Sequence, residues 1–155
     1  MLKACDNPHI IKLLALKKTP HNYYLMLEYC DGGDMLAKVR EVGALPEQQV
    51  LGYLGQILNA FQTLTTHKIM HRDFKLANIL LHQGQVKIAD FGFAKLLAGE
   101  DYTNTMLGSP LNMAPEVLGN SKYNSKADIW SIGACIYEMI YGKYLLLTQA
   151  SLRGQ

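Results

Sequence analysis

Residues 71–92 read HRDFKLANILLHQGQVKIADFG and hold polar side chains whose types and spacing could support chemistry. The amide of Asn78 and the carboxylate of Asp90 are hard oxygen ligands, which Mg²⁺ takes alongside water and substrate phosphates. Asp73 is suited to accept a proton from a hydroxyl, and Lys75 offers a point positive charge for a phosphate. A metal, a phosphate-binding charge and a base together indicate phosphoryl transfer.

A tight hairpin is the element that must bring the two predicted metal ligands together. The runs NILLH and QVKIAD flank the dipeptide QG, whose glycine can take the positive φ that such a turn needs. With this turn Ile79 pairs near Ile88, so Asn78 and Asp90 meet at the open end of the hairpin. A one-residue bulge would alter this register.

Strands are predicted early in the chain, and helices dominate the remainder. The runs IIKLLAL and NYYLMLEY, residues 10–16 and 22–29, read as two strands joined by a loop with turn residues. Asp34 is a plausible N-cap for a short helix over 35–42. Apolar residues at helical spacing then predict a long amphipathic helix over 47–66. This order predicts an α+β fold.

A further, almost wholly apolar helix is predicted after Ser125, with Asp128 three residues later completing a capping box. Residues 129–147 are apolar enough to be mistaken for a membrane span. Glu138 and Lys143 make insertion of this stretch into a bilayer unfavourable, so we predict no transmembrane segment.

The composition is that of a globular protein. The chain has 155 residues, 49% of them hydrophobic and 18% charged, with a formal net charge of +2. This weak positive charge favours neither a nucleic-acid partner nor a polybasic membrane surface. The 3 cysteines have no CxxC spacing, and the amino terminus lacks a signal peptide's apolar stretch. We therefore expect a reduced, cytoplasmic setting.

Three motifs in succession are far more specific than any one of them alone. The chain carries H-R-D-x-x-x-x-N at 71–78, D-F-G at 90–92 and A-P-E at 114–116. These are protein-kinase catalytic signatures, and the chain resembles a eukaryotic protein kinase of the serine/threonine type. The segments ADFGFAK and LGSPLNMAPEVL are most similar to those of the autophagy-initiating kinases of the UNC-like group.

The resemblance implies a protein-kinase-like α+β fold that forms one partial domain over residues 1–155. Residues 1–29 would be a remnant of the small β-rich lobe with the hinge strand, and residues 30–155 a truncated large lobe comprising most of its helical first half. Neither a G-x-G-x-x-G loop nor a V-A-I-K lysine precedes the hinge strand in this sequence. We therefore expect the chain to begin partway into the small lobe and to turn over little alone. The end of the chain, residues 144–155, does not match the helices that follow in kinases, so the apolar helix from 129 onward would lose its cover and we expect marginal stability.

By the same resemblance, Asp73 would be the catalytic base, Lys75 the γ-phosphate contact, and Asn78 and Asp90 the magnesium ligands. Ser109 would bridge Asp73 and Lys75. The implied activity is transfer of the γ-phosphate of ATP, with Mg²⁺, to serine or threonine hydroxyls of a protein substrate. A non-catalytic interaction module derived from a kinase remains the alternative, and regulatory partners cannot be read from these residues.

The resemblance also implies an adenine pocket. Leu27 would be the gatekeeper residue, the backbone of Glu28 and Cys30 would hydrogen-bond adenine, and Leu80 would form the floor beneath the purine. Asp34 would lie near the ribose or near a basic substrate side chain. Its role as a helix cap is an equally good interpretation and does not exclude the other.

Regulatory positions follow from the segment between D-F-G and A-P-E. Thr105 is the first candidate for phosphorylation and Thr103 the second, and a phosphate there could pair with Arg72. The alternative is that both threonines are ordinary solvated loop residues. The resemblance also implies that Glu116 pairs with an arginine of a later helix and that Asp128 braces the backbone of the catalytic loop.

Overall fold

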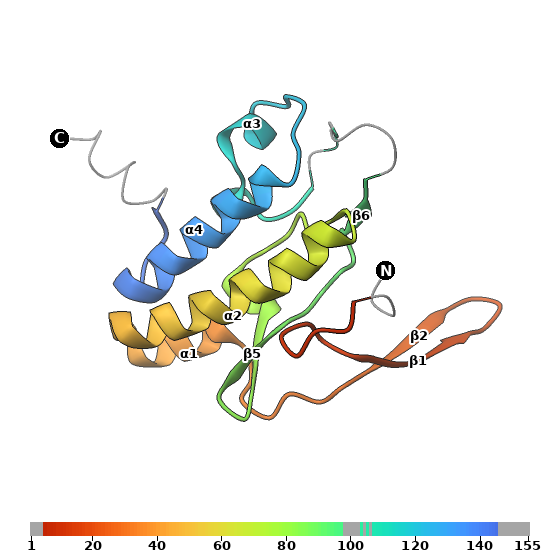
Figure 1. The fold of residues 1–155 in the computed structure, drawn as a ribbon, viewed down its shortest axis with the longest axis horizontal. Helices are drawn as coiled ribbons and strands as arrows, with labels where there is room; N and C mark the ends of the chain where they lie inside the picture. The colour runs from red at the N-terminus through yellow and green to blue at the C-terminus, as the bar shows by residue number, and fades with distance from the viewer. Residues whose placement is uncertain (1–4, 98–102, 104, 106, 146–155) are drawn as a thin grey trace.

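A computed structural model describes residues 5–97, 103, 105 and 107–145 of the chain. These residues combine helices with small antiparallel sheets, as the α+β prediction requires (Figure 1). In chain order the elements are β1 (Leu13–Lys18), β2 (Tyr23–Leu27), α1 (Met35–Val42), α2 (Glu47–Thr66), β3 (Ile69–Met70), a 3₁₀ turn (Leu76–Asn78), β4 (Ile79–His82), β5 (Gln85–Ile88), β6 (Lys95–Leu96), a second 3₁₀ turn (Pro110–Asn112), α3 (Pro115–Leu118) and α4 (Lys126–Tyr141).

The strands β1 and β2 form an antiparallel ribbon that extends away from the helices (Figure 1). The first strand begins at Leu13, later than predicted, because Ile10 and Ile11 belong to a different contact. Ile10 forms a parallel bridge to Ile88, and the amide of Ile11 donates to the Ile88 carbonyl at 2.8 Å. Both isoleucines are thereby buried against β5 rather than exposed on the ribbon.

The two predicted amphipathic helices form where the sequence places them. The side chain of Asp34 accepts a hydrogen bond from the Ala37 amide at 2.9 Å, which confirms it as the N-cap of α1. The helix α2 spans Glu47–Thr66, the range that its apolar spacing predicts. Its buried face consists of Val50, Tyr53, Ile57, Ala60, Phe61 and Leu64.

The hairpin β4–β5 has the register that the sequence predicts. Ile79 pairs with Ile88, and the turn residues Gln83 and Gly84 have φ values of 50° and 76°. Positive φ at both positions is the geometry of a type I′ turn, which matches the twist of the flanking strands. One face of the hairpin packs on α2, so the hairpin is fixed to the helical body.

The helices α2 and α4 pack together and enclose most of the apolar core with the hairpin. Phe61 of α2 meets Phe74 of the following loop edge-to-face, with ring centroids 5.0 Å apart. At its C-terminal end α4 stops at Gly142, whose φ is 67° and whose amide donates to the Glu138 carbonyl. Within the described ranges, no helix combines the length and apolarity needed to cross a bilayer.

Candidate active site

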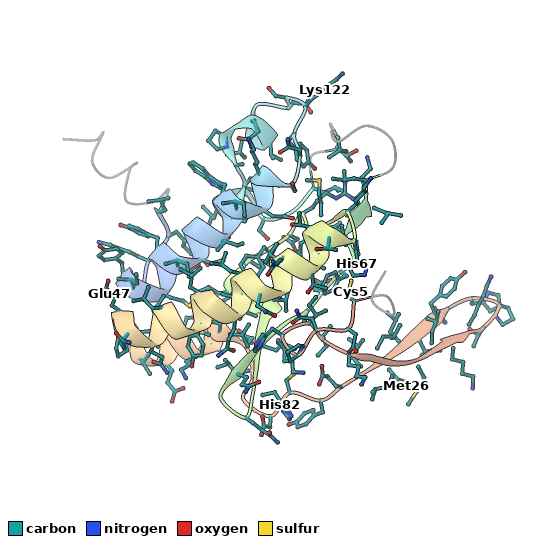
Figure 2. The ribbon with its side chains drawn as sticks, viewed as in Figure 1. Cys5, Met26, Glu47, His67, His82 and Lys122 are labelled. Atoms are coloured by element: carbon teal, nitrogen blue, oxygen red, sulfur yellow. The ribbon has the colours of Figure 1, made fainter. Side chains whose placement is uncertain are left out.

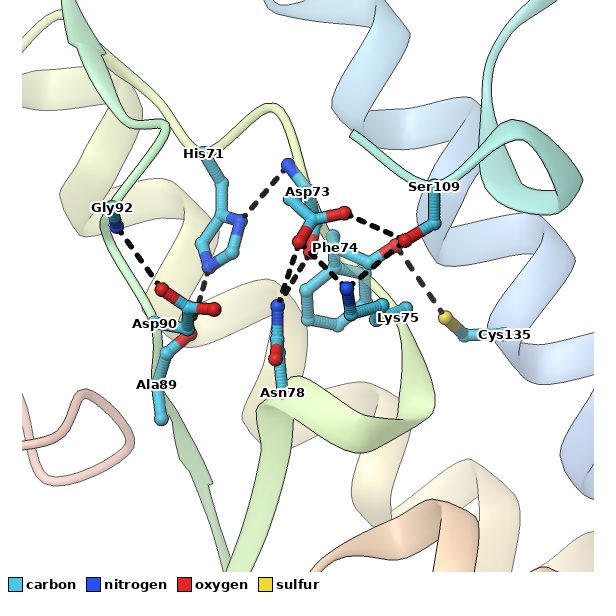
Figure 3. Close-up of polar contacts among 10 residues, drawn as sticks. All are labelled: His71, Asp73, Phe74, Lys75, Asn78, Ala89, Asp90, Gly92, Ser109 and Cys135. Carbon is cyan, nitrogen blue, oxygen red and sulfur yellow. Dashed lines mark hydrogen bonds and ion pairs between the residues drawn. The ribbon is translucent and has the colours of Figure 1, made fainter. Parts of the chain in front are cut away.

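The open end of the hairpin carries Asn78 and Asp90, as predicted. The 3₁₀ turn before β4 ends at Asn78, and the Ala89 amide donates to the Asn78 carbonyl at 2.9 Å. Asp90 follows at once with a φ of 59°, a left-handed conformation that redirects the chain after β5. The strands therefore present both side chains at the same edge of the hairpin, and Figure 3 shows them beside Asp73.

The carboxylate of Asp73 is buried and receives hydrogen bonds from three other side chains (Figure 3). Lys75 Nζ donates to Oδ2 at 2.8 Å, and the hydroxyl of Ser109 donates to Oδ1 at 2.9 Å. Lys75 Nζ also donates to Ser109 Oγ at 3.0 Å. The amide of Asn78 donates to the Asp73 carbonyl at 2.8 Å and reaches Oδ2 at 3.4 Å. The four residues thus form one connected polar network.

Ser109 reaches this network because the preceding residue is a glycine. Gly108 has a φ of 114°, and a Cβ at this position would lie 2.4 Å from the Arg72 carbonyl oxygen. The segment before Ser109 consequently runs almost in contact with the catalytic loop, which no larger residue would allow.

Asp128 holds the catalytic loop from the opposite side. Its two carboxylate oxygens accept the backbone amides of His71 and Arg72, each at 2.9 Å. This confirms the bracing role and shows that the capping-box prediction is wrong, because Ser125 makes no side-chain cap hydrogen bond. The carboxylate of Asp128 points away from its own helix end and into the loop, where two otherwise unpaired amides are buried.

His71 is fully buried and serves as a structural element of the loop. Its Nε2 donates to the Ala89 carbonyl at 3.0 Å, and its Nδ1 accepts from the Asp73 amide at 3.4 Å. Burial lowers the pKa of His71 despite the neighbouring carboxylate of Asp128, so the ring is neutral and can donate at one nitrogen and accept at the other. Burial likewise raises the pKa of Asp128, against the effect of the amides that it accepts. The His71 ring also contacts Phe91 at 5.0 Å between centroids.

The residues predicted to contact adenine are only partly gathered. Asp34 and Leu80 form an antiparallel bridge, so these two lie side by side. Leu27 is 40% exposed at the end of β2. A cavity of about 660 Å³ includes Glu28 in its lining but not Cys30 or Leu80. The predicted adenine contacts therefore border the same region without sharing one enclosed cavity.

The predicted regulatory residues occupy distinct environments. Thr103 is buried, accepts Lys95 Nζ at 3.0 Å and pairs through its backbone with Tyr123. Thr105 is exposed, and its carbonyl accepts the Tyr123 hydroxyl at 2.6 Å. Arg72 Nε donates to the Phe93 carbonyl at 2.6 Å.

Glu116 lies exposed in the first turn of α3 and makes no ion pair within the described part of the chain. The only arginine that follows Arg72 in the sequence, Arg153, lies outside the described residues. Pairing of Glu116 with an arginine of a later helix therefore stays a prediction.

The family model described as protein kinase domain matches residues 1–153. The chain belongs to the protein kinase family. Serine/threonine-protein kinase ATG1c of Arabidopsis thaliana is 40% identical over 147 residues, which cover 92% of this chain and 20% of that protein. ULK3 of Xenopus laevis and ULK1 of Homo sapiens, both serine/threonine-protein kinases, are each 38% identical over 92% of this chain.

These relatives are much longer than the chain. It spans 31% of the length of the Xenopus ULK3 and 15% of the human ULK1. The family match and the identities establish that this kinase-like α+β domain belongs to the serine/threonine kinases. The ATG1 and ULK relatives confirm the resemblance to autophagy kinases that the motifs indicated.

Sequence reasoning missed one charged contact near this site. Lys87 of β5 donates to both carboxylate oxygens of Glu28, each at 3.0 Å. The available signal was the hairpin register itself, because Lys87 lies opposite Leu80 and its side chain projects to the same face. A lysine on that face of an otherwise apolar hairpin needs an acidic partner when it is largely buried.

Proposed function

We propose that the protein is a serine/threonine protein kinase that transfers the γ-phosphate of ATP to a hydroxyl of a protein substrate. The observation that carries this proposal is the network in which Lys75 and Ser109 hold the two oxygens of a buried carboxylate, Asp73. Family membership supports the same assignment.

Asp73 is the residue proposed to receive the substrate hydroxyl. A carboxylate fixed by two donors keeps one orientation, so it can align the hydroxyl and accept its proton as the new phosphate ester forms. Lys75 Nζ, 30% exposed at the side chain, supplies a positive charge next to that carboxylate. This charge suits an incoming phosphate better than it suits a purely structural ion pair, because the lysine keeps access to solvent.

Asn78 and Asp90 have donor atoms that suit a Mg²⁺ ion. Because the Asn78 nitrogen donates to the Asp73 carbonyl, the amide oxygen is turned away from that bond and can act as a ligand. Asp90 contributes a carboxylate at the same hairpin end, with one oxygen accepting the Gly92 amide at 3.2 Å. Mg²⁺ held there would neutralise charge on ATP phosphates. We propose Leu27, Glu28, Cys30, Asp34 and Leu80 as the adenosine side of the site.

The proposal is tested by phosphoryl transfer from γ-labelled ATP to a serine- and threonine-containing protein, with Mg²⁺ present. Asp73→Asn and Asp90→Asn are expected to lower transfer by about 100-fold or more, since each removes a charge that the reaction needs. Lys122→Met is the control, because Lys122 is exposed in the loop between α3 and α4 (Figure 2). Because low turnover is expected of the chain alone, the comparison with the two variants decides: transfer that Asp73→Asn and Asp90→Asn leave unchanged would instead favour a non-catalytic interaction module.

We further propose that Thr105 is the regulatory phosphorylation site rather than Thr103. Thr105 is exposed, whereas the hydroxyl of Thr103 is buried against Lys95 and unavailable to another enzyme without local opening. Thr105→Ala is expected to lower transfer activity, and Thr103→Ser, which keeps the hydroxyl, is expected to leave it unchanged. Equal activity of Thr105→Ala and the unaltered chain would remove Thr105 from regulation.

A further inference from the structure

One ion pair joins the ribbon to the hairpin on the side of the proposed adenine site. Lys87 Nζ lies 3.0 Å from each oxygen of the Glu28 carboxylate. The side chains are only 14% and 20% exposed, respectively, so solvent screens the pair less than it would screen a surface pair.

Glu28 is also the residue that closes the end of the ribbon. Its backbone amide donates to the Lys12 carbonyl at 3.0 Å, and its carboxylate accepts the Lys12 amide at 2.7 Å. The side chain therefore replaces a backbone acceptor at a point where a register shift interrupts the ladder. Any movement of the Glu28 carboxylate is transmitted to the strand end.

The other end of the ion pair is equally well fixed. Lys87 pairs with Leu80 across the hairpin, and directly opposed residues project to the same face of a sheet. The lysine stem thus stands next to Leu80, the proposed floor beneath adenine. One side chain consequently spans the distance from the purine floor to the strand whose backbone is proposed to bind the purine edge.

Backbone hydrogen bonds anchor the chain to the hairpin on both flanks of the ribbon. The Ile11 amide donates to the Ile88 carbonyl at 2.8 Å, and the Gly32 amide donates to the Leu81 carbonyl at 2.9 Å. The ion pair lies between these two anchors. The contacts of β1 and β2 are mainly with each other, and the ribbon projects from the body (Figure 1). The cavity of about 660 Å³ runs along the ion pair and is lined by both of its members, so packed side chains do not fill this side. Between the backbone anchors, the ion pair joins Glu28 directly to β5 and is a charged constraint on this side.

We propose that the Lys87–Glu28 pair is a positioning element for adenine, which sets the separation between the Glu28–Cys30 backbone and Leu80. This inference rests on the proposed nucleotide-binding function. Lys87 and the Glu28 side chain act through the backbone and the floor residue, and neither needs to touch the nucleotide.

The charge state of Glu28 agrees with this role. Burial alone would raise the pKa of Glu28, but the hydrogen bonds from Lys87 and the Lys12 amide outweigh it and lower the pKa below its usual range. The carboxylate is therefore ionised at neutral pH, as an ion pair requires.

The experiment compares Lys87→Met, which keeps the aliphatic stem, with Lys87→Arg, which keeps the charge, and with the control Lys122→Met. Amide hydrogen exchange is measured at Lys12, whose amide donates to the Glu28 carboxylate. Dissociation constants are measured for Mg-ATP and for Mg-tripolyphosphate, an inorganic probe without adenine. Lys87→Met should speed exchange at Lys12 about tenfold and weaken Mg-ATP about fivefold, with Mg-tripolyphosphate unchanged.

The outcomes separate this inference from the proposed function. Unchanged exchange at Lys12 in Lys87→Met overturns the positioning role, whatever the nucleotide data show. Equal weakening of Mg-ATP and Mg-tripolyphosphate also overturns it, because a general loss of structure would affect both. Recovery of both readouts in Lys87→Arg supports it. If the unaltered chain binds neither probe, the nucleotide-binding function fails, and with it the adenine role of the pair.

Discussion

At the scale of single residues, Asp73 has its orientation fixed before any ligand arrives. Lys75 and Asn78 of the same loop and Ser109, 36 residues later, donate to its carboxylate, and Asp128 holds the loop that carries it. A buried carboxylate with this many donors cannot rotate without leaving several of them unpaired, which is costly. The orientation of the Asp73 carboxylate is therefore set by contacts within the chain, which is the preorganisation that its proposed role requires.

The buried carboxyl of Glu138 makes the stability of the folded chain depend on pH. This α4 carboxyl is 5% exposed, and burial raises its pKa from 4.5 to about 7, against the smaller opposing effect of Arg40. The folded chain then holds this proton more tightly than the unfolded chain. The stabilisation is complete below pH about 4.5 and is lost as pH rises through about 7, by roughly 3 kcal/mol.

The measurement is the free energy of unfolding in urea at several pH values for the unaltered chain and for Glu138→Gln. The difference between the two chains should change across this window, because glutamine does not titrate there. A constant difference from pH 4.5 to pH 7 would show that Glu138 titrates normally in the folded chain.

At the scale of elements, glycine is favourable in the hairpin turn and unfavourable within the helix α2. Gly84 has a φ of 76°, whereas Gly52 lies within a helix, and an added Cβ meets nothing within 4 Å at either position. Gly84→Ala should therefore destabilise the chain by about 1 kcal/mol, and Gly52→Ala should stabilise it by about 0.5–1 kcal/mol.

Thermal unfolding of the two variants checks this pair of expectations. Because both changes add the same methyl group to open space, opposite shifts in Tm report backbone conformation and not packing. Shifts of the same sign would mean that one of the two backbones differs from this description.

Sequence patterns predict the bounds of an element well where local contacts determine them. They fail where the bounds depend on a partner that is distant in the sequence. The ranges of α1 and α2 follow from the Asp34 cap and the apolar spacing of residues 47–66, and the turn glycine sets the hairpin register. The start of β1 could not be predicted, since Ile10 pairs with β5 rather than with the ribbon. Asp128 fits a capping-box pattern, yet its partners lie 56 and 57 residues away.

The same division applies to the site. Asn78 and Asp90 could be paired from the sequence because they flank one turn-defined hairpin, and Asp73 was indicated by the H-R-D-x-x-x-x-N motif that it shares with Asn78. The Lys87–Glu28 contact was not indicated, because 59 residues separate its members and neither belongs to a motif. The roles of all these residues in binding and transfer stay predictions.

At the scale of the whole molecule, the ribbon carries much of the exposed apolar surface. Leu16 and Leu25 are opposed in register and are 54% and 55% exposed, with Tyr23 and Met26 also exposed nearby. An apolar ribbon with open edges favours association with other chains. We expect the isolated chain to self-associate through this surface.

The double variant Leu16→Thr with Leu25→Thr should weaken self-association by about tenfold, since threonine keeps strand propensity and removes apolar area. Sedimentation velocity over a concentration series measures the effect. Leu58→Gln on α2 is the control, because Leu58 is 46% exposed but lies on a different element. An equal effect of both variants would mean that the contact surface is not the ribbon.

The low stability expected of the chain from its sequence stays a prediction.

Gly108 sets a limit on how this sequence can vary. With the Arg72 oxygen only 2.4 Å from a hypothetical Cβ, the position has room for a hydrogen atom and nothing larger. A library with every amino acid at 108 should yield glycine alone among well-folded survivors, while Gly133, with open space around it, admits several types. The path of the backbone at Arg72 thus determines which residue can occupy position 108.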